Sequence, residues 1–149
     1  MKIIVDTNIV FSAILNSNSQ IAKILLNSRG YFQFFTCNYL RTEIQRHRNK
    51  LLKITGLSEE KLLELEALIL VNITFIDERL IPQKILVNTE LQLKTIDPND
   101  TVFVALAKQL KGELWTGDMQ LYNGLKPKLF KDILLTSEIV LLLNELQRD

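Results

Sequence analysis

Residues 96–121 contain two aspartates that could take part in catalysis or metal binding. Asp100 stands at the predicted start of an apolar helix, and Asp118 follows a short apolar run that predicts a strand. A helix that packs antiparallel to its strand places its start beside the end of that strand. We therefore expect both carboxylates at the sheet edge where open α/β folds bind their ligands. Asp6 follows the apolar run KIIV in the same manner and adds a third carboxylate.

A fourth acid, Glu43, lies a little more than one helical turn past the second predicted strand, close to the same edge. Carboxylates that converge repel one another unless a cation lies between them. Oxygen ligands without histidine or cysteine partners suit Mg²⁺ or Mn²⁺. Such a centre would serve phosphoryl transfer, in which metal ions activate water and stabilise the leaving oxygen.

Each acid also has a structural interpretation that the sequence leaves open. Asp6 and Asp118 follow strand ends, where turn and cap aspartates are common. The run Asp97–Asp100 has good helix-start chemistry, with proline at its second position, and we assign Asp97 mainly to capping. A glutamate on a charged helix, such as Glu43, usually lies on a solvated face.

The elements that must position these acids alternate along the chain. Strands are predicted at residues 2–5, 32–36, 71–76, 113–116 and 132–136, and the main helices at 9–15, 20–27, 39–53, 59–70, 101–111 and 138–147. Ser19, Asn38, Ser58 and Ser137 are the expected caps of four of these helices. Alternating strands and helices predict right-handed crossovers and a three-layer α/β/α sandwich around a parallel sheet of about five strands.

Composition limits the classes of protein to consider. A chain of 149 residues, 47% hydrophobic and 23% charged, fits one globular domain over residues 1–149. The net charge of +1 gives no global attraction to a polyanion, so a nucleic-acid partner would need a local basic patch. The lone Cys37 excludes an intramolecular disulfide and a cysteine-based zinc site. Without a signal peptide or a long apolar run, we expect a cytoplasmic protein and no membrane contact.

Four segments together resemble the PIN-domain family of nucleases, also described as PilT N-terminus-like. They are KIIVDTN, NYLRTEI, DPNDTVFVALAKQL and ELWTGDMQL, and they occur in the family's order over most of the chain. The resemblance implies an α/β/α sandwich and an Mg²⁺- or Mn²⁺-dependent ribonuclease. Many relatives of this size are toxins that a small antitoxin protein neutralises.

The resemblance also assigns roles to individual residues. Its acidic positions fall on Asp6, Glu43, Asp100 and Asp118, with Asn8 and Thr116 as polar supports. We expect Asp6, Asp100 and Asp118 to bind the ion directly, and Glu43 either to bind it or to orient the attacking water. The expected reaction is hydrolysis of RNA phosphodiester bonds.

Several alternatives stay open from the sequence. The chain is either this endoribonuclease, a catalytically silent PIN-fold interaction module, or a phosphoacceptor switch on a similar sheet. The basic run Arg46–Arg48 either contacts RNA phosphates or forms a solvated helix face. The apolar residues 139–143 predict a surface for a homodimer or an antitoxin helix.

Overall fold

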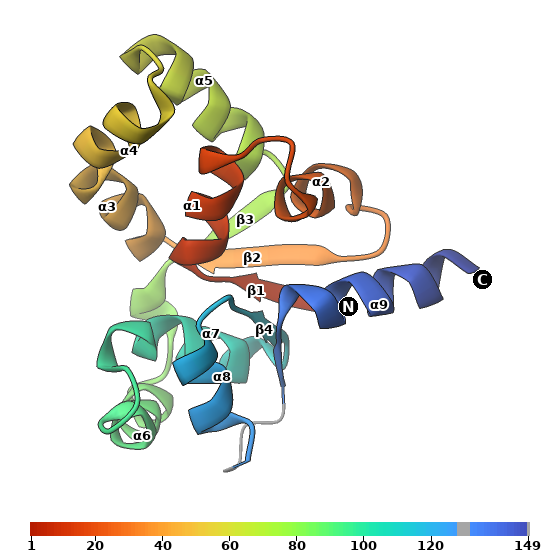
Figure 1. Ribbon diagram of the computed structural model, residues 1–149. Coiled ribbons are helices and arrows are strands. Elements are labelled where there is room, and N and C mark those ends of the chain that lie inside the picture. Colours follow the sequence, from red (N-terminus) through yellow and green to blue (C-terminus); the bar gives the residue numbers. More distant parts are fainter. Residues whose placement is uncertain (128–131, 149) are drawn as a thin grey trace.

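The central feature of the computed structural model, which describes residues 1–127 and 132–148, is a parallel sheet (Figure 1). Its five strands lie in the order β3-β2-β1-β4-β5, and every neighbouring pair is parallel. The strands are β1 (Lys2–Val5), β2 (Gln33–Cys37), β3 (Ile73–Ile76), β4 (Glu113–Trp115) and β5 (Ile133–Leu134). The expected α/β/α sandwich is therefore confirmed.

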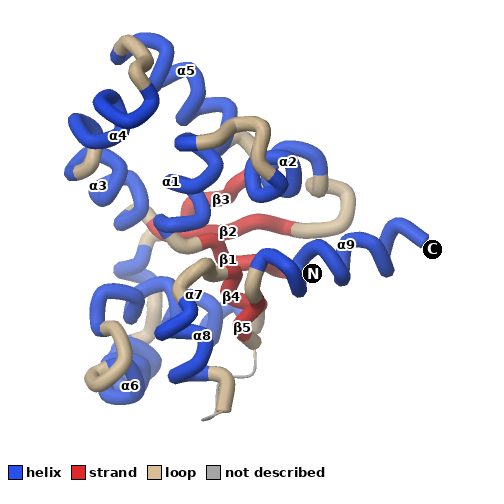
Figure 2. Tube along the Cα trace, viewed as in Figure 1, coloured by secondary structure: helices blue, strands red, loops and turns tan. Residues whose placement is uncertain are grey.

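Helices form a layer on each side of this sheet (Figure 2). One layer holds α1 (Thr7–Leu15), α2 (Gln20–Asn27), α3 (Tyr39–Arg46), α4 (Arg48–Thr55) and α5 (Glu59–Leu70). The other holds α6 (Gln83–Leu93), α7 (Thr101–Leu110) and α8 (Met119–Leu125), while α9 (Thr136–Arg148) extends away from the sheet. Two short 3-10 turns, η1 (Glu78–Leu80) and η2 (Pro98–Asp100), precede α6 and α7.

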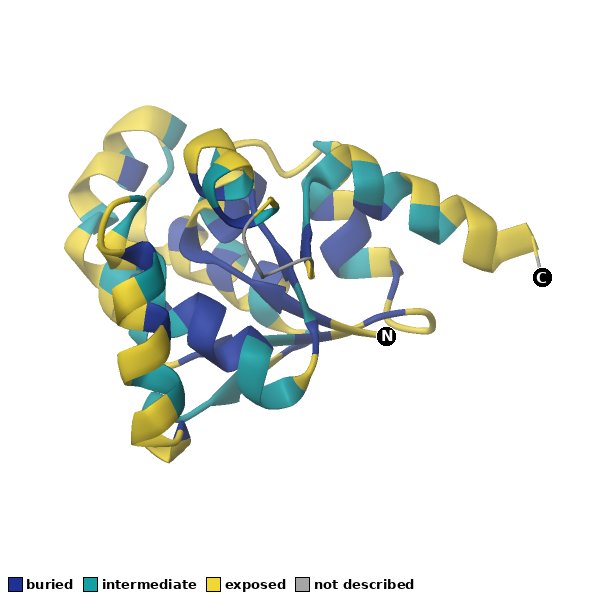
Figure 3. Ribbon diagram, turned by 90° about the horizontal axis from the view of Figure 1, so that it is seen from below, coloured by how far each residue is buried: buried dark blue, intermediate teal, exposed yellow. Residues whose placement is uncertain are grey.

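The core lies between the central strands and the helices that cover them (Figure 3). Ile3, Ile4 and Val5 of β1 are fully buried, as expected for a strand covered on both faces. In α7 every residue from Phe103 to Ala107 is buried, because this helix lies between the sheet and α6. Gly112 follows α7, and a Cβ there would lie 2.5 Å from Ile4 Cδ1 and 3.0 Å from the Lys2 carbonyl oxygen, so the absence of a side chain permits this close approach.

Two local predictions about the second crossover are wrong. The helix expected over residues 39–53 is broken at His47, whose φ of −104° and ψ of 11° separate α3 from α4. Asn38 makes no side-chain capping hydrogen bond. The Tyr39 N–H instead donates to Glu78 Oε2 at 3.3 Å, so a distant residue supplies the cap.

The expected ends of the sheet also shift. The third strand begins at Ile73 rather than Val71, and the fifth is confined to Ile133–Leu134. The last helix begins at Thr136, ahead of the predicted cap at Ser137. Within the described ranges no single helix is long and apolar enough to cross a bilayer; α1 and α2 pass such a test only together, bent by 108°.

Candidate metal centre

The carboxyl ends of β1 and β4 bring the first pair of predicted site residues together. Val5 and Trp115 are register partners in these adjacent parallel strands, so Asp6 and Thr116 leave the sheet side by side. Thr116 Oγ1 donates a hydrogen bond to Asp6 Oδ2 at 2.8 Å. The same hydroxyl oxygen accepts the Asp118 N–H at 3.0 Å. One buried threonine therefore positions two acids that are far apart in sequence.

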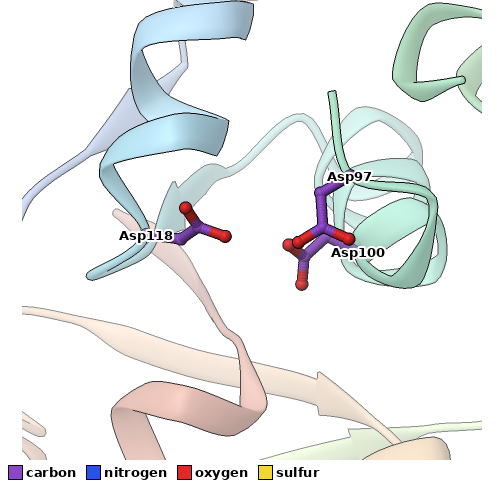
Figure 4. A group of neighbouring side chains, drawn as sticks. All are labelled: Asp97, Asp100 and Asp118. Carbon is purple, nitrogen blue, oxygen red and sulfur yellow. The ribbon is translucent and has the colours of Figure 1, made fainter. Parts of the chain in front are cut away.

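A close group of three carboxylates forms where η2 faces the start of α8. One carboxylate oxygen from each of Asp97, Asp100 and Asp118 lies within 4.8 Å of the other two. Figure 4 shows Asp118 pointing from the start of α8 towards Asp97 and Asp100. Asp118 Oδ1 also accepts the N–H groups of Gln120 and Leu121, which caps α8 and fixes the side chain.

Asp6 is the most deeply buried of these acids, with only 1% of its surface exposed. Burial raises the pKa of Asp6 to about 6; the charges of Asp118 and Glu43 add to this effect, while hydrogen bonds from Thr116 and the Ile9 N–H oppose it. A buried carboxylate close to two other acids is costly in its charged form, and a cation would relieve that cost.

Asp100 has the most strongly raised pKa of these acids. Burial raises the pKa of Asp100 to about 8. The negative charges of Asp6, Asp97 and Asp118 and a hydrogen bond with Asp97 raise it further. The donors of this group are carboxylate oxygens only, which matches the preference of Mg²⁺ and Mn²⁺. The residues present therefore fit a hard divalent cation.

Glu43 reaches the same region from α3 but stands beside the three-carboxylate group. Its Oε1 accepts a hydrogen bond from the buried Thr7 hydroxyl at 2.5 Å, and its charge acts on Asp6. Asn8, predicted as a polar support, is exposed and lines a cavity of about 180 Å³ with Phe11 and His47. Among the hydrogen bonds of the described residues, the side chain that holds Glu43 is therefore Thr7, and Asn8 forms none with the acids.

The assignment of Asp97 mainly to capping was incomplete. Asp97 does act as a cap, because its Oδ1 accepts the Asn99 N–H at 3.0 Å. Its carboxylate nevertheless also belongs to the three-acid group. The spacing was the available signal: Asp97 is the N-cap of η2, and an N-cap side chain lies near the residue three positions on, here Asp100.

Comparison with known families decides the assignment. A family model described as PIN domain matches residues 4–138. The chain belongs to the PIN-domain family. The matched range contains Asp6, Glu43, Asp97, Asp100 and Asp118, and the resemblance read from the four sequence segments is confirmed.

A solved structure shares the PIN fold. The crystal structure of VapBC2 from Rickettsia felis, bound to a DNA fragment from its promoter, contains a chain that aligns with a TM-score of 0.70 at 17% sequence identity. The alignment covers 91% of this chain and 98% of that chain, so the fold is shared over nearly its whole length. No curated protein matches the sequence.

The Thr116 hydroxyl offers a direct test of how this PIN domain positions its acids. Thr116→Val removes the donor to Asp6 and the acceptor for the Asp118 N–H while preserving the shape of the side chain. We expect a loss of roughly 1–3 kcal/mol in the free energy of unfolding. We also expect Mn²⁺ affinity to fall about 10–100-fold, as for other groups that orient metal ligands.

Thr116→Ser is the matched control, because it keeps the hydroxyl and removes only a methyl group. Urea denaturation and calorimetric Mn²⁺ titration of the two variants make the comparison. If Thr116→Val binds Mn²⁺ as tightly as Thr116→Ser, the hydroxyl does not organise the acids.

Proposed function

We propose that this PIN domain is a metal-dependent endoribonuclease that hydrolyses RNA phosphodiester bonds. The observation that carries the proposal is the convergence of carboxylates at one sheet edge. Oxygens of Asp97, Asp100 and Asp118 lie within 4.8 Å of one another, and Asp6 is close enough for its charge to raise the pKa of Asp100. Such a group is stabilised by a divalent cation and suited to phosphoryl transfer.

In this proposal the ion is held by Asp6, Asp100 and Asp118, with Asp97 completing the group. When bound, Mg²⁺ or Mn²⁺ would supply a Lewis acid that lowers the pKa of water and stabilises developing negative charge on phosphate oxygens. Thr116 keeps Asp6 and Asp118 at a fixed separation before substrate arrives. This preorganisation removes a cost that flexible side chains would otherwise meet during the reaction.

Glu43 has a separate proposed role beside the ion. The Thr7 hydroxyl holds its Oε1, which leaves Oε2 to orient the attacking water or accept its proton. A carboxylate in hydrogen-bond reach of the nucleophile is the usual arrangement for general base catalysis.

The activity is tested with a fluorescently labelled single-stranded RNA and the purified chain. We expect cleavage to products with new internal ends in the presence of Mg²⁺ or Mn²⁺, and we expect EDTA to stop it. A matched single-stranded DNA is the control for RNA preference. Cleavage that continues at the same rate in EDTA would contradict a metal-dependent reaction, and the absence of cleavage with either ion would contradict the enzyme.

We extend the proposal to the chain's partners, as the toxin of a cytoplasmic toxin–antitoxin pair. The similarity in fold to a chain of the VapBC2 complex supports this extension. On α9, Leu141 is 63% exposed and Leu146 is 36% exposed, although Ile139 of the same helix is fully buried. In this proposal the exposed Leu141 contributes an apolar contact to a second copy or to an antitoxin helix.

A further inference from the structure

A second concave site adjoins the carboxylate group and is formed by different side chains. It is a cavity of about 310 Å³, and the lining residues that matter here are Tyr39, Glu78, Leu86, Pro98, Asn99 and Val102. Pro98 and Asn99 lie between Asp97 and Asp100 in the chain. The η2 turn therefore borders the cavity, and this turn and its cap carry two acids of the candidate metal centre.

The aromatic wall of this cavity is held in place from two directions. The ring of Tyr39 packs against Phe103 of the buried α7 face, with the ring centroids 6.4 Å apart. Arg46 donates a hydrogen bond to the Tyr39 hydroxyl at 3.3 Å, and its guanidinium carbon lies 5.8 Å from the ring centroid. A ring fixed in this way meets a flat ligand with little further loss of conformational entropy.

The remaining walls combine apolar surface with the polar side chains of Asn99, Thr101 and Glu78, of which Glu78 is the only carboxylate. Leu86, Pro98 and Val102 supply the apolar part. Glu78 is held by the hydrogen bond from the Tyr39 N–H to its Oε2. An ionised carboxylate accepts hydrogen bonds and donates none, so its free lone pairs select ligand groups that carry N–H donors.

We propose that this cavity binds a nucleobase of the RNA strand, next to the phosphate that lies at the carboxylate group. The inference rests on the proposed ribonuclease function. Ligand pockets span about 300–1,000 Å³, so this cavity is at the small end and suits one base rather than an extended ligand. Single-stranded RNA is read by stacking splayed bases on aromatic side chains and by bonding to their polar edges.

The chemistry of the walls also predicts which bases are preferred. Adenine, cytosine and guanine carry exocyclic amino groups that can donate to Glu78, as glutamate accepts from the cytosine amino group in other complexes. Uracil instead presents carbonyl oxygens on either side of its single ring N–H, and these are repelled by a carboxylate. Arg46, which is exposed and forms no ion pair within the described residues, remains available for a phosphate of the same strand.

The binding test uses the four nucleoside 5′-monophosphates as probes, titrated separately into the isotopically labelled chain with Mg²⁺. We expect AMP, CMP and GMP to shift the backbone amide signals of Asn99 and Val102, and to bind several-fold more tightly than UMP. Glu78→Gln should reduce this preference, because the amide can also donate to a uracil carbonyl. If none of the four shifts these signals, the cavity is not a base site.

Tyr39→Leu tests the stacking contact, with Tyr31→Leu as its matched control. Tyr31 is 40% exposed and precedes β2, at the end of that strand opposite Tyr39. We expect Tyr39→Leu to weaken binding of the preferred monophosphates about tenfold, the effect of losing one base–aromatic stack. Tyr31→Leu should bind as the parent does. Equal affinities in the two variants would overturn the proposal.

Cleavage of RNA separates this inference from the proposed function. Oligonucleotides that differ only in the bases flanking one cleavage position should show a preference that Tyr39→Leu and Glu78→Gln both reduce. If these variants cleave RNA with the same base preference as the parent, the base site is ruled out and the proposed ribonuclease function still holds. If the parent chain binds the monophosphates but cleaves no RNA, the ribonuclease function is ruled out and the cavity is a nucleotide-binding site.

Discussion

Asp100→Asn is expected to reduce Mg²⁺- or Mn²⁺-dependent RNA cleavage about a thousandfold or more, and to make the metal-free protein more stable. The loss follows from removing a proposed direct ligand, and it should exceed the effect of removing a group that only orients ligands. The gain follows from the environment of Asp100, where burial and three neighbouring aspartates raise its pKa to about 8. A neutral amide avoids both the cost of burying a charge and the repulsion by the neighbouring aspartates.

The gain in stability should be roughly 1–2 kcal/mol at pH 8, in the range seen when a strained functional residue is replaced. Urea denaturation in EDTA measures it, and cleavage of labelled RNA measures the loss of activity in the same preparations. A variant that cleaves within tenfold of the parent, or that is less stable than the parent without metal, would contradict the role assigned to Asp100.

Asp6→Asn is the matched comparison, because it should lose cleavage without the gain in stability. Both carboxylate oxygens of Asp6 accept hydrogen bonds, one from the Ile9 N–H and one from the Thr116 hydroxyl. An asparagine turns its NH₂ group towards one of these donors and leaves that donor unpaired in a buried place. The two variants together separate metal binding from electrostatic repulsion.

The second large effect is on the pH dependence of stability. Without metal, the free energy of unfolding should fall as pH rises from about 4 to about 8. The folded-state pKa is about 6 for Asp6 and about 8 for Asp100, and the reference pKa of both is 3.8. The folded state therefore binds more protons than the unfolded state within this window, and raising the pH favours unfolding.

The size of this effect follows from the pKa shifts. For Asp6 alone, raising the pKa from 3.8 to about 6 corresponds to roughly 3 kcal/mol of folding stability. This stability is present at low pH and is lost once the pH exceeds the folded-state pKa. Saturating Mn²⁺ should restore stability at pH 8, by about 2.7 kcal/mol at a hundredfold excess over its Kd. At pH 5, where protons compete for the same oxygens, the ion should have much less effect.

Urea denaturation at pH 5 and at pH 8, each with EDTA or with Mn²⁺, gives the four free energies of unfolding to be compared. Asp100→Asn provides the control, since it lacks one of the titrating groups and should show a shallower decline. A metal-free protein whose stability stays level or rises from pH 5 to pH 8 would show that burial and mutual repulsion do not raise the pKa of these carboxylates in the folded chain.

Local chemistry explains which features the sequence could predict. Ser19 and Ser58 accept the Ala22 and Lys61 N–H groups, each at 3.2 Å, and begin α2 and α5 as expected. Both interactions lie within one helical turn, so composition and spacing reveal them. Asp6 and Asp118 follow apolar strands whose carboxyl ends meet at one edge in any parallel sheet, which is why their proximity was predictable.

Features that depend on distant contacts were not predictable in the same way. The break at His47 accompanies a ring contact with Phe11, at 5.3 Å between centroids, and a hydrogen bond between its Nδ1 and the Glu43 carbonyl. The cap of α3 comes from Glu78, 39 residues away. The place of Asp97 beside Asp100 and Asp118 depends on the position of α8 opposite η2. Tertiary structure decides all three.

The basic run 46–48 shows how the structure narrows an ambiguous pattern. Arg48 pairs with Glu66 at 3.1 Å, with 19% and 10% of the two side chains exposed, so it is committed to holding α4 against α5. Arg46 instead contacts Tyr39 beside the proposed base site. The run is therefore divided between a structural ion pair and a residue placed towards the proposed RNA path.

Calorimetric titration of Mn²⁺ into the purified chain tests most directly whether carboxylates from separate segments form one metal centre. The parent should give a saturable binding heat, and Asp118→Ala, which removes the acid contributed by the start of α8, should give none. Equal heats from the two proteins, or no heat from the parent, would contradict the metal centre.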